Sequence, residues 1–585
     1  MSVVLGIASS HDASACLFRD GRLEAAVSEE RLSRIKCDGG HLPNLAIDAC
    51  LAQAGLKRGD VDHIASIYGH FPDRYIRRGS MTKDLERRLS RMWKNMRGAG
   101  TETQFYSNNL LKKLRDDPAL HGRKFEDYFR TGAFLESEQF RPDVRVHFVG
   151  HHLTHAAAAA MYSGYSEAAV ITMDGEGDLD MHHGSYLFRD GRLECRHVSE
   201  TVGCSPGYFY MAITELLGFM PLRHEGKVLG LAAFGDPEPL KAQFRRALRL
   251  SRDGTGFDSD FAGMDRAYDR REQFLREAIN GHSRENVAAA AQAVFEESIV
   301  LLVRNFLVAT GMRRLAVNGG VFANVKLNQR IAALPECDSL FVFPAMSDAG
   351  NSAGAALLVQ DALEPGFIGR GVHALETVYW GSAPTRDEIK AELDRRSLAY
   401  EEVGLDGVVE RTAQAMHAGR VVGWFQGAME FGPRALGNRS MVAAPVDKSI
   451  NTWFNARLER SEFMPFAPSA LAEYADTVFE NVEPGRHSAE FMTITFDVKQ
   501  DWQPKIPAVV HVDGTARPQL VRRERNPRYW ALIERYRQLS GIPLVLNTSF
   551  NVHEEPIVCG PREAVQALVD KRIDHLAIGD FWVPG

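Results

Sequence analysis

Two histidines spaced four positions apart are the first residues whose types and spacing suggest chemistry. His151 and His155 stand in Gly150-His-His-Leu-Thr-His155, directly before an alanine run at 156–160 that favours a helix. Both rings would share one helix face and reach one metal ion, whereas His152 points elsewhere. Such a pair is more often incidental than a ligand pair when nothing else accompanies it.

Carboxylates at the ends of two expected strands strengthen the case for a metal ion. Asp174 follows the apolar run 169–173, and Asp348 follows the run 339–343. Two histidines with carboxylates and open positions suit Fe²⁺, Mn²⁺ or Zn²⁺, and the donor set does not separate these ions.

Arginines in bent loops indicate a second kind of chemistry, the binding of an anion. Arg434 and Arg439 lie in the Gly/Pro-bent stretch 430–440 after the apolar run 421–426. A guanidinium binds phosphate through two parallel hydrogen bonds. Further candidates are Arg457, Arg460, Arg517 and the polar turn Asn547-Thr-Ser549-Phe-Asn551. Each alone is better explained as a surface residue, and together an anion site and a solvated surface are equally good interpretations.

His11-Asp12 follows the N-terminal apolar run 3–7. An imidazole at the end of a strand can accept a proton from a hydroxyl at neutral pH. A histidine that only caps or packs is an equally good interpretation of the local sequence.

An exact internal repeat suggests the elements that position these residues. Leu17-Phe-Arg-Asp-Gly-Arg-Leu-Glu24 recurs identically at 187–194, and its Asp-Gly pair is a strong hairpin signal. Each copy follows an apolar strand that runs into an acidic loop. The repeat therefore predicts a duplicated α/β fold of the actin and sugar-kinase type, with nucleotide and metal bound by loops at strand ends.

Two further strand–turn–helix units fit that fold. The run 315–317 leads into Asn318-Gly319-Gly320, and the run 339–343 leads into 347–350. Both turns are expected to present backbone N–H groups to a phosphate or an adenosine. Turn residues at 364–384 predict a domain boundary, and the apolar runs 421–426, 509–512 and 544–546 predict a second α/β domain with its site on the following loops.

Composition excludes several classes of protein. The chain has 585 residues, a formal net charge of −7 and seven scattered cysteines without a C-x-x-C pair, which favours a cytosolic enzyme with reduced thiols. The N-terminus lacks a basic leader, and charges interrupt the longest apolar stretch, 287–309, which we expect to be a buried helix. We expect neither a membrane nor a nucleic acid as partner.

One segment departs from this balance. Residues 74–124 carry 14 Lys/Arg against 5 Asp/Glu. Leu85, Leu89, Met92 and Met96 follow helical spacing, so a solvated helical insertion is one interpretation, and a lid over an acceptor site or a homodimer contact is the other.

Several motifs together resemble the NodU/CmcH O-carbamoyltransferases, which modify nodulation factors and antibiotics. They are Ser10-His-Asp-Ala-Ser14, Glu29-Glu-Arg-Leu-Ser-Arg34, Gly150-His-His-Leu-Thr-His-Ala156, Gly226-Lys-Val-Leu-Gly-Leu-Ala232, Phe431-Gly-Pro-Arg-Ala-Leu-Gly-Asn-Arg-Ser440, Phe463-Met-Pro-Phe-Ala-Pro468 and Asn547-Thr-Ser-Phe-Asn551. The matches extend from residue 3 to about 560.

The resemblance implies two domains. Residues 1–375 would form an actin-like carbamoyl-transfer domain with the basic insertion at about 70–140, and residues 376–585 a YrdC-like domain. ATP and carbamoyl phosphate would give carbamoyl-adenylate in the second domain. A hydroxyl of a small natural product, such as an antibiotic, a toxin or a sugar, would then take the carbamoyl group, with Mg²⁺ accompanying the ATP. A tRNA threonylcarbamoyl-type transferase and a nucleotide-switched binding protein are the alternatives.

The resemblance also assigns roles to residues. The metal, Fe²⁺ by preference, would be held by His151, His155, Asp174 and Asp348. His11 would be the base, with Asp12 and Lys36 beside it. Nucleotide and carbamoyl phosphate would meet the following residues: Lys227, Asn318, Gly319, Gly320, Arg434, Arg439, Arg460, Arg517, Asn547 and Ser549. The family's lysine near residue 460 is absent, so either Arg457 or Arg460 replaces it.

Overall fold

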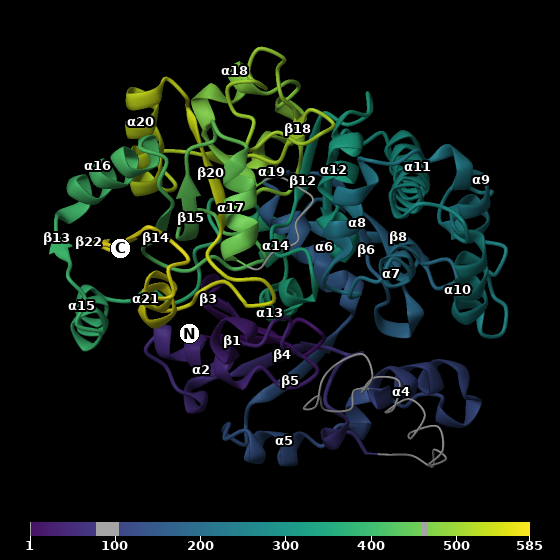
Figure 1. The fold of residues 1–585 in the computed structure, drawn as a ribbon. Helices are drawn as coiled ribbons and strands as arrows, with labels where there is room; N and C mark the ends of the chain where they lie inside the picture. The colour runs from purple at the N-terminus through teal and green to yellow at the C-terminus, as the bar shows by residue number, and fades with distance from the viewer. Residues whose placement is uncertain (1, 78–104, 459–465) are drawn as a thin grey trace. The chain divides into compact units, whose positions relative to one another are not determined.

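The computed structural model describes residues 2–77, 105–458 and 466–585 (Figure 1). The chain divides into two compact units. Unit 1 contains residues 1–208, 316–321 and 345–374, and unit 2 contains 209–315, 322–344 and 375–585. The expected boundary near residue 375 is a point where the chain re-enters unit 2. The assignment of residues 1–375 and 376–585 to two functional domains stays a prediction.

The first sheet of unit 1 is mixed and has the order β3-β2-β1-β4-β5. Its strands are β1 (Val3–Ala8), β2 (Ser14–Arg19), β3 (Arg22–Ser28), β4 (His63–Ile67) and β5 (Arg145–Val149). The first three pair antiparallel, and β1, β4 and β5 pair parallel. Helices α1 (Glu30–Ser33) and α2 (Asn44–Gln53) connect β3 to β4, so the sheet is a βββαβ unit.

The second sheet of unit 1 repeats this pattern. Antiparallel β6 (Ala168–Met173), β7 (His183–Arg189) and β8 (Arg192–Ser199) come first in the sequence, and β11 (Arg314–Asn318) lies next to β6. The order β11-β6-β7-β8 matches β4-β1-β2-β3 strand for strand. Two mixed βββαβ sheets are typical of actin-like proteins, as the sequence repeat predicts.

The repeated octapeptides form equivalent hairpins. The turn residues Asp20 and Gly21 have φ of 50° and 77°, and Asp190 and Gly191 have 51° and 71°. Positive φ at both central residues is the turn that matches the twist of a two-residue hairpin. A register shift interrupts each hairpin, at Leu17/Phe18 in one and at Ser185/Tyr186 in the other. The predicted duplication of strand, turn and strand is confirmed.

Two helices of unit 1 pack closely because glycines remove side chains at their contacts. These are α6 (His151–Tyr162) and α13 (Asn351–Leu363). A Cβ on Gly354 would lie 2.1 Å from the carbonyl oxygen of Thr154, and a Cβ on Gly6 of β1 would lie 2.0 Å from that of Ser352. The Thr154 hydroxyl donates to Asn351 Oδ1 at 2.6 Å. These contacts fix α6 relative to the first sheet.

Unit 2 contains an eight-stranded mixed sheet with the order β13-β22-β21-β14-β15-β20-β16-β19. Its strands are β13 (Glu401–Glu402), β14 (Val422–Phe425), β15 (Arg439–Ala443), β16 (Ala467–Leu471), β19 (Gln519–Val521), β20 (Leu544–Ser549), β21 (His575–Ile578) and β22 (Phe581–Pro584). The strands expected at 421–426 and 544–546 are confirmed. The strand expected at 509–512 is absent from the structure, so that expectation is wrong. The backbone N–H of His511 donates to the carbonyl oxygen of Thr515, and its carbonyl oxygen accepts from the N–H of Gly514, so the segment forms a tight turn.

The other helices and strands, among them β12 next to β11 in the second sheet, have the following bounds. They are α4 (Phe105–Asp116), α5 (Thr131–Ser137), α7 (Pro206–Leu216), α8 (Glu225–Ala232), α9 (Glu238–Ala247), α10 (Ala267–Ala278), α12 (Val325–Ala332), α14 (Phe367–Gly371), α15 (Arg386–Arg395), α16 (Gly404–His417), α17 (Ser449–Arg457), α18 (Ala475–Val478), α19 (Arg486–Ala489), α20 (Pro527–Ser540), α21 (Pro561–Val569), β9 (Arg249–Leu250), β10 (Phe257–Asp258), β12 (Ser339–Val342), β17 (Phe496–Asp497) and β18 (Thr515–Ala516).

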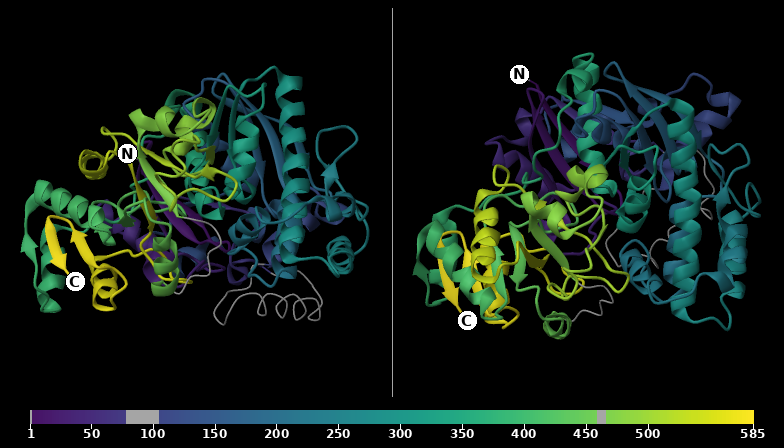
Figure 2. Two further views of the ribbon diagram at one scale, coloured as in Figure 1. Left: turned by 45° about the horizontal axis from the view of Figure 1, so that its top comes forward. Right: turned by 90° about the horizontal axis from the view of Figure 1, so that it is seen from above.

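Helix α11 (Arg284–Thr310), the long teal helix in both views of Figure 2, is the stretch expected to be a buried helix. Ser283 caps its start by accepting from the backbone N–H of Asn286, and Gly311 ends it in the left-handed region. Within the described residues it is the one helix long and apolar enough to cross a membrane, yet 67% of its most apolar window is buried in protein. Such burial is typical of a core helix.

The basic segment is only partly described. Residues 78–104, including Leu85, Leu89, Met92 and Met96, lie outside the described residues. Helix α4 follows them and contacts the loop after β6, where Asn108 Oδ1 accepts from the backbone N–H of Leu179 at 2.9 Å. Lys112 pairs with Asp180 at 2.6 Å. The interpretation of the segment as a lid or a dimer contact stays a prediction.

Candidate metal centre and anion-binding loops

Three elements of unit 1 place the four predicted metal ligands. Helix α6 begins at His151 and carries His155 one turn later on the same face. Asp174 directly follows β6, and Asp348 opens the short 3-10 turn 348–350 that precedes α13. Strand ends and a helix start therefore bring together side chains that are far apart in the sequence, as the spacing predicts.

The polar atoms of the four side chains converge, at distances of 3.1 to 3.9 Å. His151 Nε2 lies 3.6 Å from Asp174 Oδ2 and 3.6 Å from Asp348 Oδ1. His155 Nε2 lies 3.1 Å and 3.9 Å from the same two oxygens. One donor atom from each of the four residues lies within 4.8 Å of all the others. A single ion can therefore contact all four.

The burial of this cluster is the strongest sign that it holds an ion. Both imidazoles are fully buried, and none of their four ring nitrogens makes a hydrogen bond within the described residues. Asp174 Oδ2 has no hydrogen-bond donor there either. Buried polar atoms without partners are costly, and two histidines with two carboxylates are a common donor set for Fe²⁺, Mn²⁺ or Zn²⁺. The residues present therefore fit a divalent metal ion.

The histidines and the carboxylates of the cluster shift one another's pKa values. Burial alone would lower the pKa of His151, but Asp348, Asp174 and Asp178 raise it to about 9. Burial would raise the pKa of Asp348, yet His151 and His11 hold it well below its ordinary value. Asp174 is likewise held low, by His151 and His155. Both carboxylates are thus ionised at neutral pH, as metal ligands must be.

His152 and Asp178 support the cluster without joining it. His152 contacts Thr172 Oγ1 and the carbonyl oxygen of Met181, and burial lowers its pKa to about 3, so it is a neutral core residue. Asp178 Oδ2 accepts from the backbone N–H of His151 at 2.7 Å and so holds the N-terminus of α6. The sequence reasoning missed Asp178, although it is the last residue of Asp174-Gly-Glu-Gly-Asp178.

His11 lies beside this cluster. Its Nδ1 is 3.4 Å from Asp348 Oδ2, its Nε2 is 3.5 Å from Asp12 Oδ2, and 21% of its side chain is exposed. The loop that carries Lys36 packs on the His11 turn, since Gly40 donates its N–H to the carbonyl oxygen of Ser10. Lys36 pairs with Glu30 at 3.8 Å. The structure therefore brings His11, Asp12 and the metal ligands together.

The glycine turn at 318–320 contacts the loop of a metal ligand. Gly319 has a φ of 108°, and a Cβ there would lie 2.1 Å from the carbonyl oxygen of Met173. A Cβ on Gly320 would lie 2.8 Å from Asp174 Oδ1. Asn318 is buried and donates to the carbonyl oxygen of His155 at 3.0 Å. The turn is thus built against the metal cluster, and its contact with a nucleotide stays a prediction.

Arg439 of unit 2 is a fully buried residue that shapes its loop. Its guanidinium donates to the carbonyl oxygens of five residues: Ser382, Gln426, Gly427, Asn438 and Cys559. It also lies 3.8 Å over the ring of Phe425. These contacts give Arg439 a structural role, and its predicted contact with an anion is untested.

Asn547 connects the loops that carry the other anion candidates. Its side chain on β20 donates to the carbonyl oxygen of Ala435, next to Arg434, and to Gln519 Oε1, two residues after Arg517. Ser549 ends the same strand and donates to Asn551 Oδ1 at 2.6 Å. The loops of Arg434, Arg517 and Ser549 therefore meet at one end of the sheet. Arg460 lies outside the described residues, and Lys227 is buried on α8.

The sequence reasoning also missed Glu430. This buried carboxylate accepts from the backbone N–H groups of Leu436, Asn438 and Arg439 at 2.8, 2.8 and 3.1 Å. It folds the arginine-bearing segment into a closed loop. The position of Glu430 at the start of the motif 430–440 was the sequence feature that could have indicated this role.

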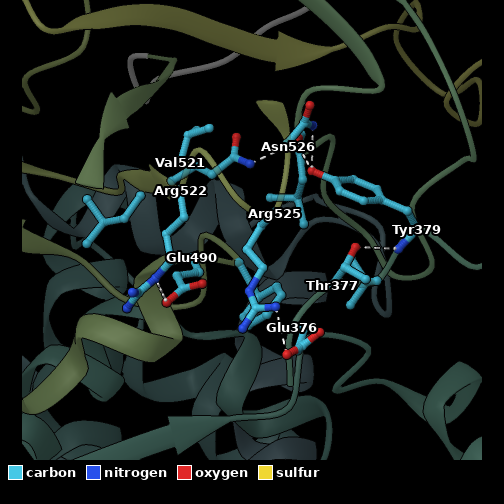
Figure 3. Close-up of a pocket in the computed structure, with 13 residues that line it drawn as sticks. Glu376, Thr377, Tyr379, Glu490, Val521, Arg522, Arg525 and Asn526 are labelled. Atoms are coloured by element: carbon cyan, nitrogen blue, oxygen red, sulfur yellow. Dashed lines mark hydrogen bonds and ion pairs between the residues drawn. The ribbon is translucent and has the colours of Figure 1, made fainter. Parts of the chain in front are cut away.

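A pocket borders these loops (Figure 3). Its charged residues are paired, since Arg522 donates to Glu490 at 2.6 Å and Arg525 lies 2.7 Å from Glu376. Its lining residues Leu436 and Gln519 each stand two positions from a predicted anion residue. None of Arg434, Arg439 and Arg517 lines the pocket itself.

Comparison with known proteins identifies the family. Residues 3–357 match the model "Carbamoyltransferase N-terminus", and residues 413–584 match "Carbamoyltransferase C-terminus". Nodulation protein NolNO of Sinorhizobium fredii is 33% identical over 98% of this chain and 79% of its own length. Nodulation protein U of Rhizobium tropici is 31% identical over 50% of this chain and 48% of its own length.

The likeness to two solved structures is weak. Component A of the (R)-2-hydroxyglutaryl-CoA dehydratase of Acidaminococcus fermentans is 11% identical, with a TM-score of 0.34 over 62% of this chain and 100% of its own. HypF of T. kodakarensis is 12% identical, with a TM-score of 0.33 over 62% and 48%. Such values carry no information on activity. The two family models together span most of the chain, and on that ground this protein is a carbamoyltransferase of the family that includes the nodulation proteins U and NolO.

Proposed function

We propose that this carbamoyltransferase uses ATP and carbamoyl phosphate to carbamoylate a hydroxyl of a small natural product, such as an antibiotic, a toxin or a sugar. Carbamoyl phosphate, water and ATP would give carbamoyl-adenylate, phosphate and pyrophosphate. The acceptor hydroxyl would then attack the carbonyl carbon, and AMP would leave as the new C–O bond forms. Water enters the first step because the carboxylate of carbamate must be free to displace pyrophosphate from ATP.

The arginine-bearing loops of unit 2 support the first step. Arg434 and Arg517 lie on loops that Asn547 of β20 joins at one end of the sheet, and Ser549 is the last residue of the same strand. Guanidinium groups and a hydroxyl there would neutralise and orient the phosphate groups of both substrates. Arg439 would contribute by keeping the loop in shape. Mg²⁺ would accompany the ATP.

The metal cluster of unit 1 supports the second step, and the convergence of its buried donor atoms is the observation on which the proposal mainly rests. His151, His155, Asp174 and Asp348 would hold Fe²⁺, Mn²⁺ or Zn²⁺, with Fe²⁺ preferred. The ion would supply a Lewis acid for a carbonyl or phosphate oxygen. In unit 1 the turn Asn318-Gly319-Gly320 would contact the nucleotide. Lys227 of unit 2 would be a separate contact for a phosphate group.

His11 would act as the base for the acceptor. It is partly exposed, so a hydroxyl can reach it, and Asp348 and Asp12 face its two ring nitrogens. The imidazole would take the hydroxyl proton as the C–O bond forms, and the flanking carboxylates would stabilise the resulting cation. Lys36, on the adjacent loop, would offset negative charge near the leaving AMP.

The test is whether ATP cleavage depends on carbamoyl phosphate. We expect the purified protein with a divalent metal to form AMP and pyrophosphate only when carbamoyl phosphate is present, and mass spectrometry to detect one added carbamoyl group on an accepted substrate. ATP turnover that is indifferent to carbamoyl phosphate would contradict the proposal and would point to a nucleotide-switched binding protein.

A further inference from the structure

The turn that precedes Arg517 contains a buried histidine that the proposed function does not use. The segment reads His511-Val-Asp513-Gly-Thr515-Ala-Arg517, and all of it belongs to unit 2. Only 9% of the His511 side chain is exposed, whereas 53% of its neighbour Val512 is exposed. The turn therefore reaches the surface, but the imidazole packs into the protein.

Asp513 orients this imidazole. His511 Nδ1 lies 3.2 Å from Asp513 Oδ1, which also accepts from the backbone N–H of Thr515 at 3.1 Å and from its hydroxyl at 2.6 Å. Lys326 of α12, also in unit 2, pairs with Asp513 Oδ2 at 2.7 Å. Burial would raise the pKa of Asp513, but the hydrogen bonds from His511, Lys326 and Thr515 hold it far below its ordinary value. The carboxylate is thus ionised and can only accept, so the proton of the neutral imidazole lies on Nδ1.

The other ring nitrogen of His511 is a buried acceptor. With the proton on Nδ1, Nε2 carries a lone pair, and it makes no hydrogen bond within the part of the chain that the structure describes. Because Nδ1 faces the partly exposed Asp513, Nε2 points in a different direction, into the protein. A buried acceptor calls for a donor, and an imidazole that a carboxylate orients in this way is suited to take a proton from a hydroxyl or a water.

The chain leads from this turn directly to the arginine-bearing loops. Strands β18 and β19 flank Arg517, and the proline that follows Arg517 disfavours a helical conformation there. Side chains two positions apart on an extended segment share one face, so Thr515, Arg517 and Gln519 lie on the same side. Gln519 donates to the carbonyl oxygen of Leu436 at 2.8 Å, two residues after Arg434. The face on which Thr515 holds Asp513 is therefore also the face of the predicted anion residues.

We propose that His511 is the base that activates the water consumed in the first step, the conversion of carbamoyl phosphate to carbamate. This assignment rests on the function proposed above. Nε2 takes one proton from the water as the water oxygen bonds to the carbonyl carbon. The bond from that carbon to the bridging phosphate oxygen then breaks, and the imidazolium returns the proton to the departing phosphate. The carbamic acid loses its own proton to solvent, and the resulting carbamate attacks ATP.

The neighbours of His511 have complementary roles in this step. Asp513 is a positioning residue, because it keeps the proton of the imidazole on Nδ1 and stabilises the imidazolium that forms. Lys326 and Thr515 fix the carboxylate in turn. Arg517 binds the phosphate group of the same substrate and offsets its charge as it leaves.

Ammonium carbamate supplies carbamate directly and so separates this role from a structural one. Pyrophosphate release is measured on the full-length protein with a divalent metal, Mg²⁺ and ATP, with either carbamoyl phosphate or ammonium carbamate. The wild type should release pyrophosphate with both. His511→Gln should be slower by about 10²- to 10⁴-fold with carbamoyl phosphate, the usual contribution of a positioned base, and should keep the wild-type rate with ammonium carbamate. Asp513→Asn should show the same selective loss, because the ring loses its orienting charge.

A matched control uses His417, an exposed histidine of unit 2 at the end of α16. His417→Gln should keep both rates, and circular dichroism should show that every variant is folded. The assignment of His511 would be overturned by a His511→Gln variant that keeps the rate with carbamoyl phosphate or loses both rates equally. It would also be overturned by a wild type that uses carbamoyl phosphate but not carbamate. A wild type that releases no pyrophosphate with carbamoyl phosphate would instead contradict the proposed function itself.

Discussion

In this enzyme, burial and hydrogen-bond partners distinguish side chains of the same type. His151 and His155 are buried without hydrogen bonds within the described residues, whereas His152 between them bonds at both nitrogens. Three histidines at the start of one helix thus have two different environments. The difference follows from the helix face, which four-residue spacing preserves and single-residue spacing changes.

At the residue scale, His11→Ala is predicted to separate base catalysis from metal binding. We expect carbamoyl transfer to fall by about 10²- to 10⁴-fold, the usual contribution of a positioned base, because no group would take the hydroxyl proton. The metal content should stay at the wild-type value, since His11 contacts Asp348 and is not one of the four donors. Loss of the metal in this variant would show that His11 is a ligand instead.

Arg439 and Arg434 are predicted to differ, although both belong to one motif. Arg439→Gln should lower the free energy of unfolding by about 3 kcal/mol or more, because it leaves buried carbonyl oxygens without donors. Arg434→Gln should leave stability nearly unchanged and should impair formation of carbamoyl-adenylate. Denaturant unfolding and pyrophosphate release check the pair, and equal stability of the two variants would contradict the structural role of Arg439.

At the scale of elements, the contact of α6 with α13 positions the metal ligands. Gly354→Ala should destabilise the protein by about 1–3 kcal/mol, because the new methyl group would meet the backbone of Thr154. Gly226→Ala on α8 is the matched control, since nothing lies within 4 Å of its Cβ position. It should gain about 0.5–1 kcal/mol from helix propensity. Thermal unfolding compares the two, and a neutral Gly354→Ala would contradict the close contact.

The loop that packs on His11 is predicted to lose stability at alkaline pH. The hydrogen bond of His41 to Asp38 raises the pKa of His41 to about 9, against the opposing effect of partial burial. Because the pKa of His41 is higher in the folded than in the unfolded protein, protonation of His41 stabilises the folded state. This stabilisation is complete below the unfolded pKa of about 6.5 and disappears as the pH rises through about 9. Glu29 also faces the ring and supports its charge.

The measurement compares the wild type with His41→Gln. The wild type should be the more stable protein at about pH 6, and the difference in unfolding free energy should shrink by about pH 10. A difference that stays constant over this range would mean that protonation of His41 does not stabilise the loop.

At the scale of the whole molecule, the two half-reactions are predicted to be separable. His155→Ala should keep pyrophosphate release that depends on carbamoyl phosphate, because the arginine-bearing loops belong to unit 2. It should lose transfer to the acceptor, whereas Arg434→Ala should lose both steps. Pyrophosphate release and acceptor mass spectrometry give the two readouts. Loss of both steps in a folded His155→Ala variant would contradict the prediction that the two steps depend on different units.

Local patterns determined much of this protein before any tertiary information. The repeated octapeptide predicted two equivalent hairpins, because an Asp-Gly turn between apolar strands has one favoured geometry. Helix periodicity placed His151 and His155 together, and strand ends placed Asp174 and Asp348. The apolar run 509–512 misled, since a short run forms a strand only when a neighbouring strand supplies hydrogen bonds.

Only the tertiary structure decided the roles that depend on contacts distant in sequence. In the fold, Asp178 accepts a hydrogen bond from the N-terminus of α6, and Glu430 accepts from three backbone N–H groups. Arg439 donates to five carbonyl oxygens. The fold also brings Lys326 next to Asp513. Residue type and spacing determine what a side chain can bind, but burial and distant partners determine what it does bind. For that reason the sequence by itself indicated a carbamoyltransferase with a metal centre, and the fold showed which side chains meet there.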